Sequence, residues 1–213
     1  MVHQFQIINH TAYNINVIEI ENKLSYSCIP TADNERNEKE LVECLQFSDG
    51  YTSEIDLNLR PWIASLSDSL LEGVILIIDY GFPRPEYYHP DRTMGTLMCH
   101  YRHHNHTDPF LYPGLQDITA HVDFTNIAEA ATDASLEVLG YCEQAAFLLS
   151  CGLTEIALQN TTLTEKDRII QNQGINKLTS AAEMGELFKV IALGRNFDEP
   201  LLGFSMIDRR YAL

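Results

Sequence analysis

The sequence predicts an α/β fold in which a small β-meander precedes an open sheet that is covered by helices and ends in an antiparallel strand. The N-terminal residues form short β-branched runs with alternating polar and apolar side chains. Further on, an amphipathic helical pattern leads directly into a continuous apolar run, which is half of a βαβ unit. Two apolar runs near the C-terminus are joined by a turn-rich link, which predicts a closing antiparallel pair.

The N-terminal part, residues 1–50, is predicted to be the β-meander followed by a charged loop. Strands are expected at residues 5–8, 14–20 and 24–29, with Asn-rich breaks between them. Residues 31–40 are polar and charged throughout, which predicts an exposed loop that leads into a short helix.

Residues 51–213 are predicted to form the α/β domain. Apolar residues recur at three- and four-residue spacing over residues 57–71, which predicts an amphipathic helix with Pro61 in its first turn. The apolar run at residues 74–78 is typical of a strand that is buried on both faces of a parallel sheet.

The rest of this domain begins with a long connection and then resumes the alternation of helices and strands. Residues 82–122 are rich in Pro, His and Tyr and show no clear periodicity, so a long loop is expected. We expect the later elements to be helices over 124–133, 143–150 and 163–182 and strands over 136–141, 187–193 and 201–207.

Composition and charge narrow the classes of function. A formal net charge of −16 with only 14 Lys and Arg argues against a nucleic-acid-binding surface. A cationic partner suits this balance, but acidity also simply keeps a protein soluble, so both interpretations stay open. Five cysteines without a CxxC pair indicate neither a disulfide framework nor a zinc knuckle, and a reducing compartment is expected. The chain shows no basic leader and no membrane-spanning run, so we expect a cytoplasmic protein.

The first candidate site lies at the carboxyl end of the predicted buried strand. Asp79 is followed by Tyr80 and Gly81, and ligands of open α/β sheets bind at this end of the strands. The alternative is that the Asp79 carboxylate only accepts a backbone amide of the following turn. The pattern alone does not separate the two.

The second candidate precedes the predicted helix at 124–133. Asp123 is expected to cap that helix. In the functional interpretation, His121 takes a proton and Asp123 orients a cationic substrate. Both roles are compatible with each other.

Four of the eight histidines fall within residues 99–106, which raises the question of a metal site. Their spacing lacks an HExxH pattern on a defined element, so surface or substrate contacts are expected instead. No two of the 11 glycines are separated by a single residue, so a glycine-rich nucleotide or cofactor loop is absent.

Several short motifs together resemble the MidA-like family of S-adenosylmethionine-dependent methyltransferases, whose mitochondrial members assist the assembly of respiratory complex I. The resemblance covers most of residues 54–194. The motifs that carry it are Asp79-Tyr80-Gly81, Gly95-Thr96-Leu97, Tyr101-Arg102, Asp108-Pro109, Pro113-Gly114, the segment 117–124 and the segment 182–190.

The resemblance implies a class I methyltransferase sheet of the Rossmann-like type, of which this chain would be the C-terminal part. It implies methylation of arginine side chains in a protein, with S-adenosylmethionine as cofactor. Because the glycine-rich loop of the family is missing, we expect this chain alone to be inactive and its exposed sheet edge to favour self-association. The expected site residues are Asp79, His121 and Asp123 as catalytic residues and Tyr80, Tyr101 and Arg102 as substrate-binding residues.

Two other functions compete with this one. A non-catalytic module would dock a basic protein through its acidic surface. A metal protein would use the histidine-rich segment and take up zinc or nickel.

Overall fold

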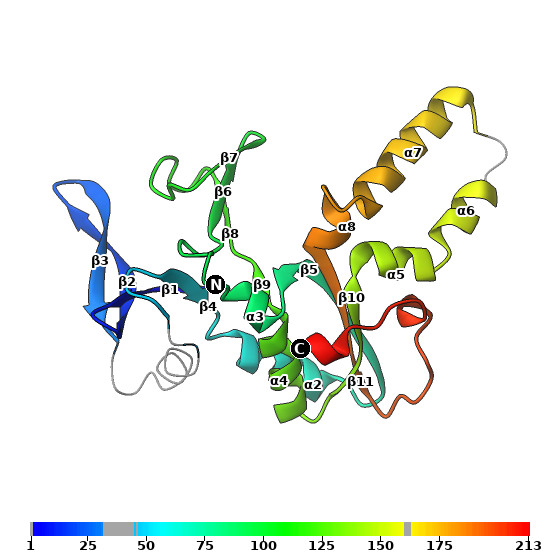
Figure 1. The fold of residues 1–213 in the computed structure, drawn as a ribbon, viewed down its shortest axis with the longest axis horizontal. Helices are drawn as coiled ribbons and strands as arrows, with labels where there is room; N and C mark the ends of the chain where they lie inside the picture. The colour runs from blue at the N-terminus through cyan, green and yellow to red at the C-terminus, as the bar shows by residue number, and fades with distance from the viewer. Residues whose placement is uncertain (1, 32–44, 46, 160–162) are drawn as a thin grey trace. The chain divides into compact units, whose positions relative to one another are not determined.

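The N-terminal strands form an antiparallel sheet, as predicted. The computed structural model describes residues 2–31, 45, 47–159 and 163–213 (Figure 1). Its sheet has the order β3-β2-β1-β4, with β1 at His3–Ile8, β2 at Thr11–Ile20, β3 at Lys23–Pro30 and β4 at Thr52–Ile55. The hairpin turns carry positive φ angles at Asn9-His10 and Glu21-Asn22, which is the geometry of two-residue hairpins. The meander is confirmed, and the loop predicted at 31–40 lies, beyond Thr31, outside the described residues.

These strands belong to the first of two compact units, which comprises Met1–Asn58 and Pro85–His121. The second unit comprises Leu59–Arg84 and Val122–Leu213. The predicted division at residue 50, between the β-meander with its charged loop and the α/β domain, stays a prediction.

Residues 82–122 are not the structureless loop that the sequence predicts. They contain α3 (Arg84–Tyr87) and a three-stranded antiparallel sheet in the order β7-β6-β8. Its strands are β6 at Met98–Tyr101, β7 at His104–His106 and β8 at Asp117–Thr119. Strands of three or four residues are too short to show a period of two, which explains the error. The hairpin turn between β6 and β7 lies at Arg102 and His103, both with positive φ.

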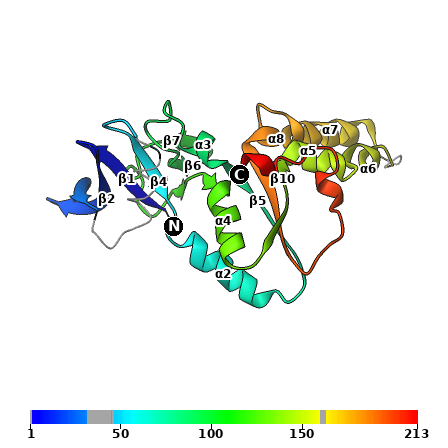
Figure 2. The same ribbon diagram turned by 60° about the horizontal axis from the view of Figure 1, so that its bottom comes forward.

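The second unit is built on a sheet in the order β10-β11-β5-β9 (Figures 1 and 2). Its strands are β5 at Gly73–Phe82, β9 at Val122–Asp123, β10 at Glu137–Glu143 and β11 at Phe188–Arg195. The last strand, β11, is antiparallel to both of its neighbours, as predicted. Only β9 runs parallel to β5.

Two helices cover one face of this sheet: α2 at Leu59–Ser69 and α4 at Phe124–Asp133. Both were predicted from their apolar periodicity and lie within two residues of the expected ends. Their inner faces pack with the strands into the main core, whose fully buried members include Ile63, Phe124, Ile127, Ile191 and Leu193.

The opposite face is covered over β10 and β11. Helix α5 (Gln144–Ser150) and the 3₁₀ turn η1 (Leu202–Phe204) pack there against Cys142, Val190 and Ala192. The sequence predicts a strand over 201–207, and that prediction is wrong. A Cβ on Gly140 would lie 2.3 Å from the Phe204 ring, so this ring can pack closely on β10 only because Gly140 has no side chain. The close packing of Phe204 favours the compact turn over an extended strand.

Strand β5 is not buried on both faces, contrary to the prediction. Ile75 and Ile77 pack against the main core, whereas Leu76 and Ile78 are 45% and 47% exposed. Among the described residues, β5 pairs along residues 73–80 with the antiparallel β11 alone and meets the parallel β9 only at Gly81 and Phe82. An apolar run predicts a doubly buried strand only when neighbours cover both of its faces.

The remaining helices extend the second unit away from the sheet (Figures 1 and 2). They are α6 at Leu153–Gln159, α7 at Glu165–Thr179 and α8 at Met184–Leu187, and a last 3₁₀ turn, η2, spans Arg210–Ala212. Thr164 caps α7 by accepting a hydrogen bond from the amide of Asp167. None of the helices in the described ranges is long and apolar enough to cross a bilayer.

Candidate functional site

Asp79 lies near the carboxyl end of β5, where the sequence places it. Its Oδ1 accepts a hydrogen bond of 2.8 Å from the Tyr80 amide, as the structural alternative expects, and this bond does not decide between that alternative and a ligand role. Burial raises the pKa of this half-buried carboxyl above its ordinary value, and that amide opposes the rise. Lys189 faces Asp79 in the strand register, but its ammonium donates to the Glu186 carbonyl. Within the described ranges, no cationic side chain pairs with the Asp79 carboxylate.

Gly81 brings β9 against the end of β5. A Cβ on this glycine would lie 2.1 Å from the carbonyl oxygen of Val122, so a side chain is excluded at this contact. The register that follows places Phe82 opposite Asp123. The strand pairing therefore holds Asp79, Tyr80 and Asp123 at the same end of β5. Tyr80 packs there with its ring edge-on to Phe188, at a centroid distance of 5.5 Å.

Asp123 has the capping role that the sequence predicts. Its Oδ1 accepts a hydrogen bond from the Asn126 amide at 3.2 Å. Its Oδ2 accepts from Nε of Arg84, also at 3.2 Å. Burial raises the pKa of the Asp123 carboxyl, and the Arg84 guanidinium opposes that rise. The carboxylate that was expected to orient a cationic substrate is thus already paired with a cation of its own chain.

Arg84 connects Asp123 to a larger ion-pair network, and sequence reasoning missed it. Its two terminal nitrogens donate to both oxygens of Glu129, at 2.6 and 2.8 Å. Glu129 also accepts from Arg60, which pairs with Asp133 as well. These bonds keep the pKa of Glu129 below its ordinary value and that of Arg84 above its own. Only the position of Arg84, two residues after the end of β5, could have pointed to it.

His121 is the last residue of the first unit. Its backbone amide donates to Oγ1 of Thr96 at 3.0 Å, and its Nδ1 atom is buried. A role in proton removal stays a prediction, because the structure places His121 in a different unit from Asp79 and Asp123.

Tyr101 and Arg102 lie at the β6–β7 hairpin in the first unit. The Tyr101 ring stacks on Tyr112, with a centroid distance of 4.4 Å and an interplanar angle of 29°. The Arg102 guanidinium lies 5.3 Å from the Tyr101 ring centroid, within the range of a cation–π contact. The Tyr101 ring thus already contacts Tyr112 and a guanidinium of its own chain, and its contact with a substrate stays a prediction.

The histidine-rich segment forms this same hairpin. Among the residues that the structure describes, which include all of 99–121, no group of three or more His, Cys, Asp or Glu side chains is arranged to hold a metal ion. The four histidines of this segment lie on the two short strands of the hairpin and in the turn between them.

Glu54 is a fully buried carboxylate that the sequence analysis did not identify. It accepts hydrogen bonds from the amides of Thr96 and Leu97, from the Thr96 hydroxyl and from the Gln4 side chain, at 2.9 to 3.3 Å. Gly95 makes room for it, because a Cβ there would lie 2.3 Å from Glu54 Oε1. With four donors from its own chain, Glu54 holds the turn at residues 93–97 against β4 and has a structural role.

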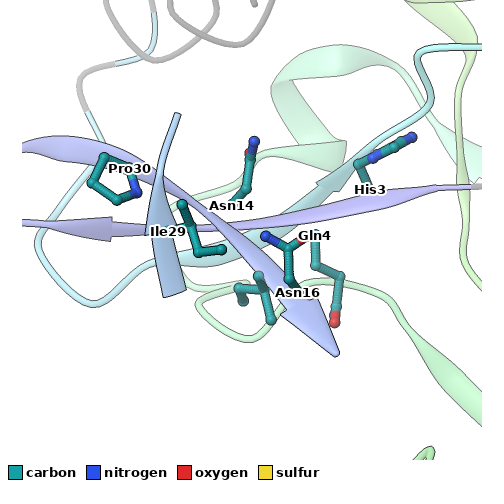
Figure 3. A pocket seen from close by; sticks show the side chains of 7 residues that line it. His3, Gln4, Asn14, Asn16, Ile29 and Pro30 are labelled. Carbon is teal, nitrogen blue, oxygen red and sulfur yellow. The ribbon is translucent and has the colours of Figure 1, made fainter. Parts of the chain in front are cut away.

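One pocket of the first unit lies on the N-terminal sheet (Figure 3). None of the predicted site residues lines it. Its polar side chains are mainly the uncharged amides of Gln4, Asn14 and Asn16, which carry no negative charge to bind a guanidinium. The full lining is His3, Gln4, Asn14, Ile15, Asn16, Ile29 and Pro30.

Comparison with known proteins identifies the family. The profile of the family described as "Putative S-adenosyl-L-methionine-dependent methyltransferase" matches residues 2–142, which is well over half of the chain. The chain belongs to this MidA-like methyltransferase family. The resemblance of the motifs at the end of β5 and before α4 is thereby confirmed.

Relatives of this MidA-like chain include proteins named "Protein arginine methyltransferase NDUFAF7 homolog, mitochondrial" and "Protein arginine methyltransferase NDUFAF7, mitochondrial". The first, from Drosophila melanogaster, is 34% identical over 143 residues, which cover 62% of this chain and 30% of the relative. The second, from Rattus norvegicus, is 33% identical over 124 residues, which cover 57% of this chain and 26% of the relative. The matches thus span less than a third of the length of these relatives.

Solved structures of a superfamily member from Burkholderia thailandensis share the fold along the whole chain. The native form has a TM-score of 0.93 and 38% sequence identity, and the match covers 100% of this chain and 56% of that protein. A second structure, bound to S-adenosyl-homocysteine, has a TM-score of 0.92 at the same identity and is matched over 55% of its length. The chain therefore corresponds to little more than half of that protein.

Proposed function

We propose that this chain supplies the protein-substrate side of an S-adenosylmethionine-dependent protein arginine methyltransferase and does not act alone. Family membership supports the reaction class, and the names of the fly and rat relatives support arginine as the substrate side chain. The basic partner suited to the net charge of −16 is then a protein that carries the target arginine.

The observation that carries this proposal is the difference between the two candidate carboxylates. Asp123 is paired with Arg84 and caps α4, whereas Asp79 accepts only the neighbouring Tyr80 amide among the described residues. Burial also raises the pKa of Asp79, and a bound guanidinium would relieve that unfavourable environment. A guanidinium offers donors in a planar fork that fits a carboxylate, so Asp79 is the residue to orient it.

The other site residues have supporting roles in this proposal. Tyr80 borders the bound guanidinium next to Asp79. In the first unit, Tyr101, with Arg102 beside it, is the proposed contact for the substrate protein through its ring, and the role of His121 in proton removal stays a prediction. Asp123 positions α4 and Arg84 and does not contact the substrate.

S-adenosylmethionine does not fit the residues of this chain. The sequence lacks any glycine pair with the spacing of a cofactor loop. At the end of β5, Gly81 packs directly against the backbone of Val122, so Gly81 itself is not part of a glycine cradle for a cofactor. We therefore assign cofactor binding to the part of the family fold that this chain does not span, and we derive no step of methyl transfer from the chain itself. The predicted cytoplasmic location stays a prediction, since the named relatives are mitochondrial.

Titration calorimetry with S-adenosylmethionine tests the division of roles. We expect no binding by the 213-residue chain and binding by the same chain joined N-terminally to the part of the Burkholderia protein outside the match. Binding by the chain alone would contradict the proposal. Binding by neither form would favour a non-catalytic module that docks a basic protein.

The substitution Asp79→Asn in the joined protein tests the role of Asp79. We expect methylation of an arginine-containing protein substrate to fall by about 100-fold, because the guanidinium loses its charged partner. The folding stability of the variant at neutral pH should be equal or higher, because the raised pKa shows that burial disfavours the charged form in the folded protein. Asp123→Asn is the matched control, because Asp123 is paired with Arg84 and does not contact the substrate, and it should lower methylation much less than Asp79→Asn does. Full activity of Asp79→Asn would exclude the proposed role.

A further inference from the structure

Lys189 is a buried lysine that the proposed function does not yet use. This residue is only 6% exposed, and it lies in β11 directly opposite Asp79 of β5. The Cβ atoms of such a pair are roughly 5 Å apart, so the ammonium at the end of the Lys189 side chain can reach the Asp79 carboxylate. A lysine that is removed from water needs polar partners inside the protein. The choice of partner by Lys189 therefore affects how open Asp79 is to a ligand.

The Lys189 ammonium contacts two groups other than Asp79. It donates a hydrogen bond to the carbonyl oxygen of Glu186 in α8. It also lies 5.4 Å from the centroid of the Phe82 ring, which is within the range of a cation–π contact. Phe82 is the last residue of β5, and Glu186 lies two residues before the start of β11. Both contacts are therefore found at the end of the sheet where Asp79 lies.

The carboxylates on either side of Lys189 in the sheet accept other donors. Glu143 of β10 is opposite Lys189 in the register and pairs with Arg209. Asp79 accepts the Tyr80 amide. An ammonium in contact with the Asp79 carboxylate would lower its pKa, yet burial raises that pKa, and it is the Tyr80 amide that opposes the rise. The Lys189 ammonium therefore does not serve as the counterion of Asp79.

We propose that Phe82 is a positioning residue whose ring, together with the Glu186 carbonyl, holds the Lys189 ammonium away from Asp79 and so keeps this carboxylate open to the substrate guanidinium. The inference rests on the proposed function, because it takes Asp79 as the residue that binds the guanidinium. Without the ring, the ammonium loses its cation–π contact, and the Asp79 carboxylate is an acceptor within reach on the same face of the sheet. Lys189 would then compete with the substrate for Asp79.

The pKa of Asp79 tests the proposal without relying on activity. It is measured by carbon-detected NMR titration of the 213-residue chain, in which Asp79→Asn identifies the signal. In Phe82→Leu we expect this pKa to fall by about one pH unit or more, because the Lys189 ammonium then pairs with the carboxylate. Phe82→Tyr retains a ring and should leave the pKa unchanged. Adding Lys189→Met to Phe82→Leu should restore the raised pKa.

Two further variants complete this experiment. Phe188→Leu is the matched control, because it removes a ring at the same end of the sheet that packs on Tyr80, and it should leave the pKa of Asp79 unchanged. Lys189→Met alone should also leave that pKa nearly unchanged, which keeps the proposal testable if Phe82→Leu fails to fold. A clear rise in Lys189→Met would show that the ammonium already pairs with Asp79 and would overturn the proposal. An unchanged pKa in Phe82→Leu, or a fall that persists after Lys189→Met is added, would overturn it as well.

Kinetics of the joined protein separate this inference from the proposed function. Phe82→Leu should raise the KM for an arginine-containing protein substrate by about tenfold and change kcat much less, because Lys189 then competes for the binding of the substrate at Asp79. Adding Lys189→Met should bring the KM back toward that of the unaltered protein. A lowered pKa of Asp79 without a change in KM would support the positioning contact and remove the proposed role of Asp79 instead.

Discussion

Arg84 illustrates how one side chain holds the end of β5 and the start of α4 together. It donates to Asp123 and to both oxygens of Glu129, and its own side chain is only 25% exposed. This arrangement explains why Asp123 is unsuited to bind a second cation. The stability of the second unit therefore also depends on a residue that no helical or strand pattern in the sequence marks as important.

Replacing Arg84 by Met should lower the free energy of unfolding at neutral pH by about 2 kcal/mol. The loss is smaller than for a fully buried pair, because solvent screens the partly exposed Glu129. The defect should shrink on acidification from about pH 7 to about pH 4. The hydrogen bond from Arg84 is the largest cause of the lowered pKa of Glu129, and Arg60 lowers it as well, so the part of the stability that Glu129 gains from Arg84 is lost as the pH falls. Without Arg84, the raised pKa of Asp123 rises further, so the variant gains stability from protonation.

Urea unfolding at several pH values measures this dependence on Arg84. Arg84→Lys retains the charge without the bidentate geometry and should give an intermediate defect. A defect that stays constant or grows toward acidic pH would show that the ion pairs are not its cause.

Among the secondary-structure elements, the short pairing of β5 with β9 depends on Gly81. Gly81→Ala would place a Cβ 2.1 Å from the Val122 carbonyl oxygen, and we expect a loss of about 2 kcal/mol in the free energy of unfolding. Gly174→Ala is the control, since this position in α7 has nothing within 4 Å and should gain about 1 kcal/mol. Thermal unfolding of the two variants measures both effects. An unchanged free energy of unfolding for Gly81→Ala would show that β9 can shift away from β5 without cost.

The elements also show what the sequence could and could not predict. Helix α4 was predicted with its correct ends, because Asp123 supplies a cap and the apolar period is strong. The turn at Leu202–Phe204 was predicted as a strand, because no local pattern reveals that Phe204 packs on Gly140 from a distant part of the chain. Similarly, the burial of β5 depends on neighbours that the local sequence does not encode.

The candidate site was predictable to a similar degree. The carboxylates at the strand end and at the helix cap were identified from their positions, and both local hydrogen bonds were found. The sequence could not show that Asp123 is already paired with a cation while Asp79 is not. Arg84 makes this difference, and its other partner, Glu129, is 45 residues away in the sequence. Glu54 was missed for the same reason, since its four donors include residues more than 40 positions away.

For the molecule as a whole, the two compact units should differ in their response to a local defect. Glu54→Gln removes an acceptor oxygen from the buried cluster at Thr96 and should destabilise the first unit by about 2 kcal/mol. The single tryptophan, Trp62, lies in α2 and reports on the second unit alone. We therefore expect hydrogen exchange in β4 to accelerate while the urea midpoint of Trp62 fluorescence stays unchanged.

The control for this experiment is Glu19→Gln, at an exposed position on the same N-terminal sheet. It should alter neither readout. An equal shift of the Trp62 midpoint in Glu54→Gln would show that the two units unfold as one cooperative block.

The pairing of Phe82 with Asp123 has a consequence for the segment between them. The chain leaves the second unit after Arg84 and re-enters it at Val122, and the strand register keeps these two points close together. The intervening segment thus behaves as a cassette with adjacent ends, and lengthening or replacing it costs the host sheet little closure entropy. Residues 85–121, including the aromatic hairpin of Tyr101 and Arg102, can accordingly be lengthened without moving the carboxylate at Asp79.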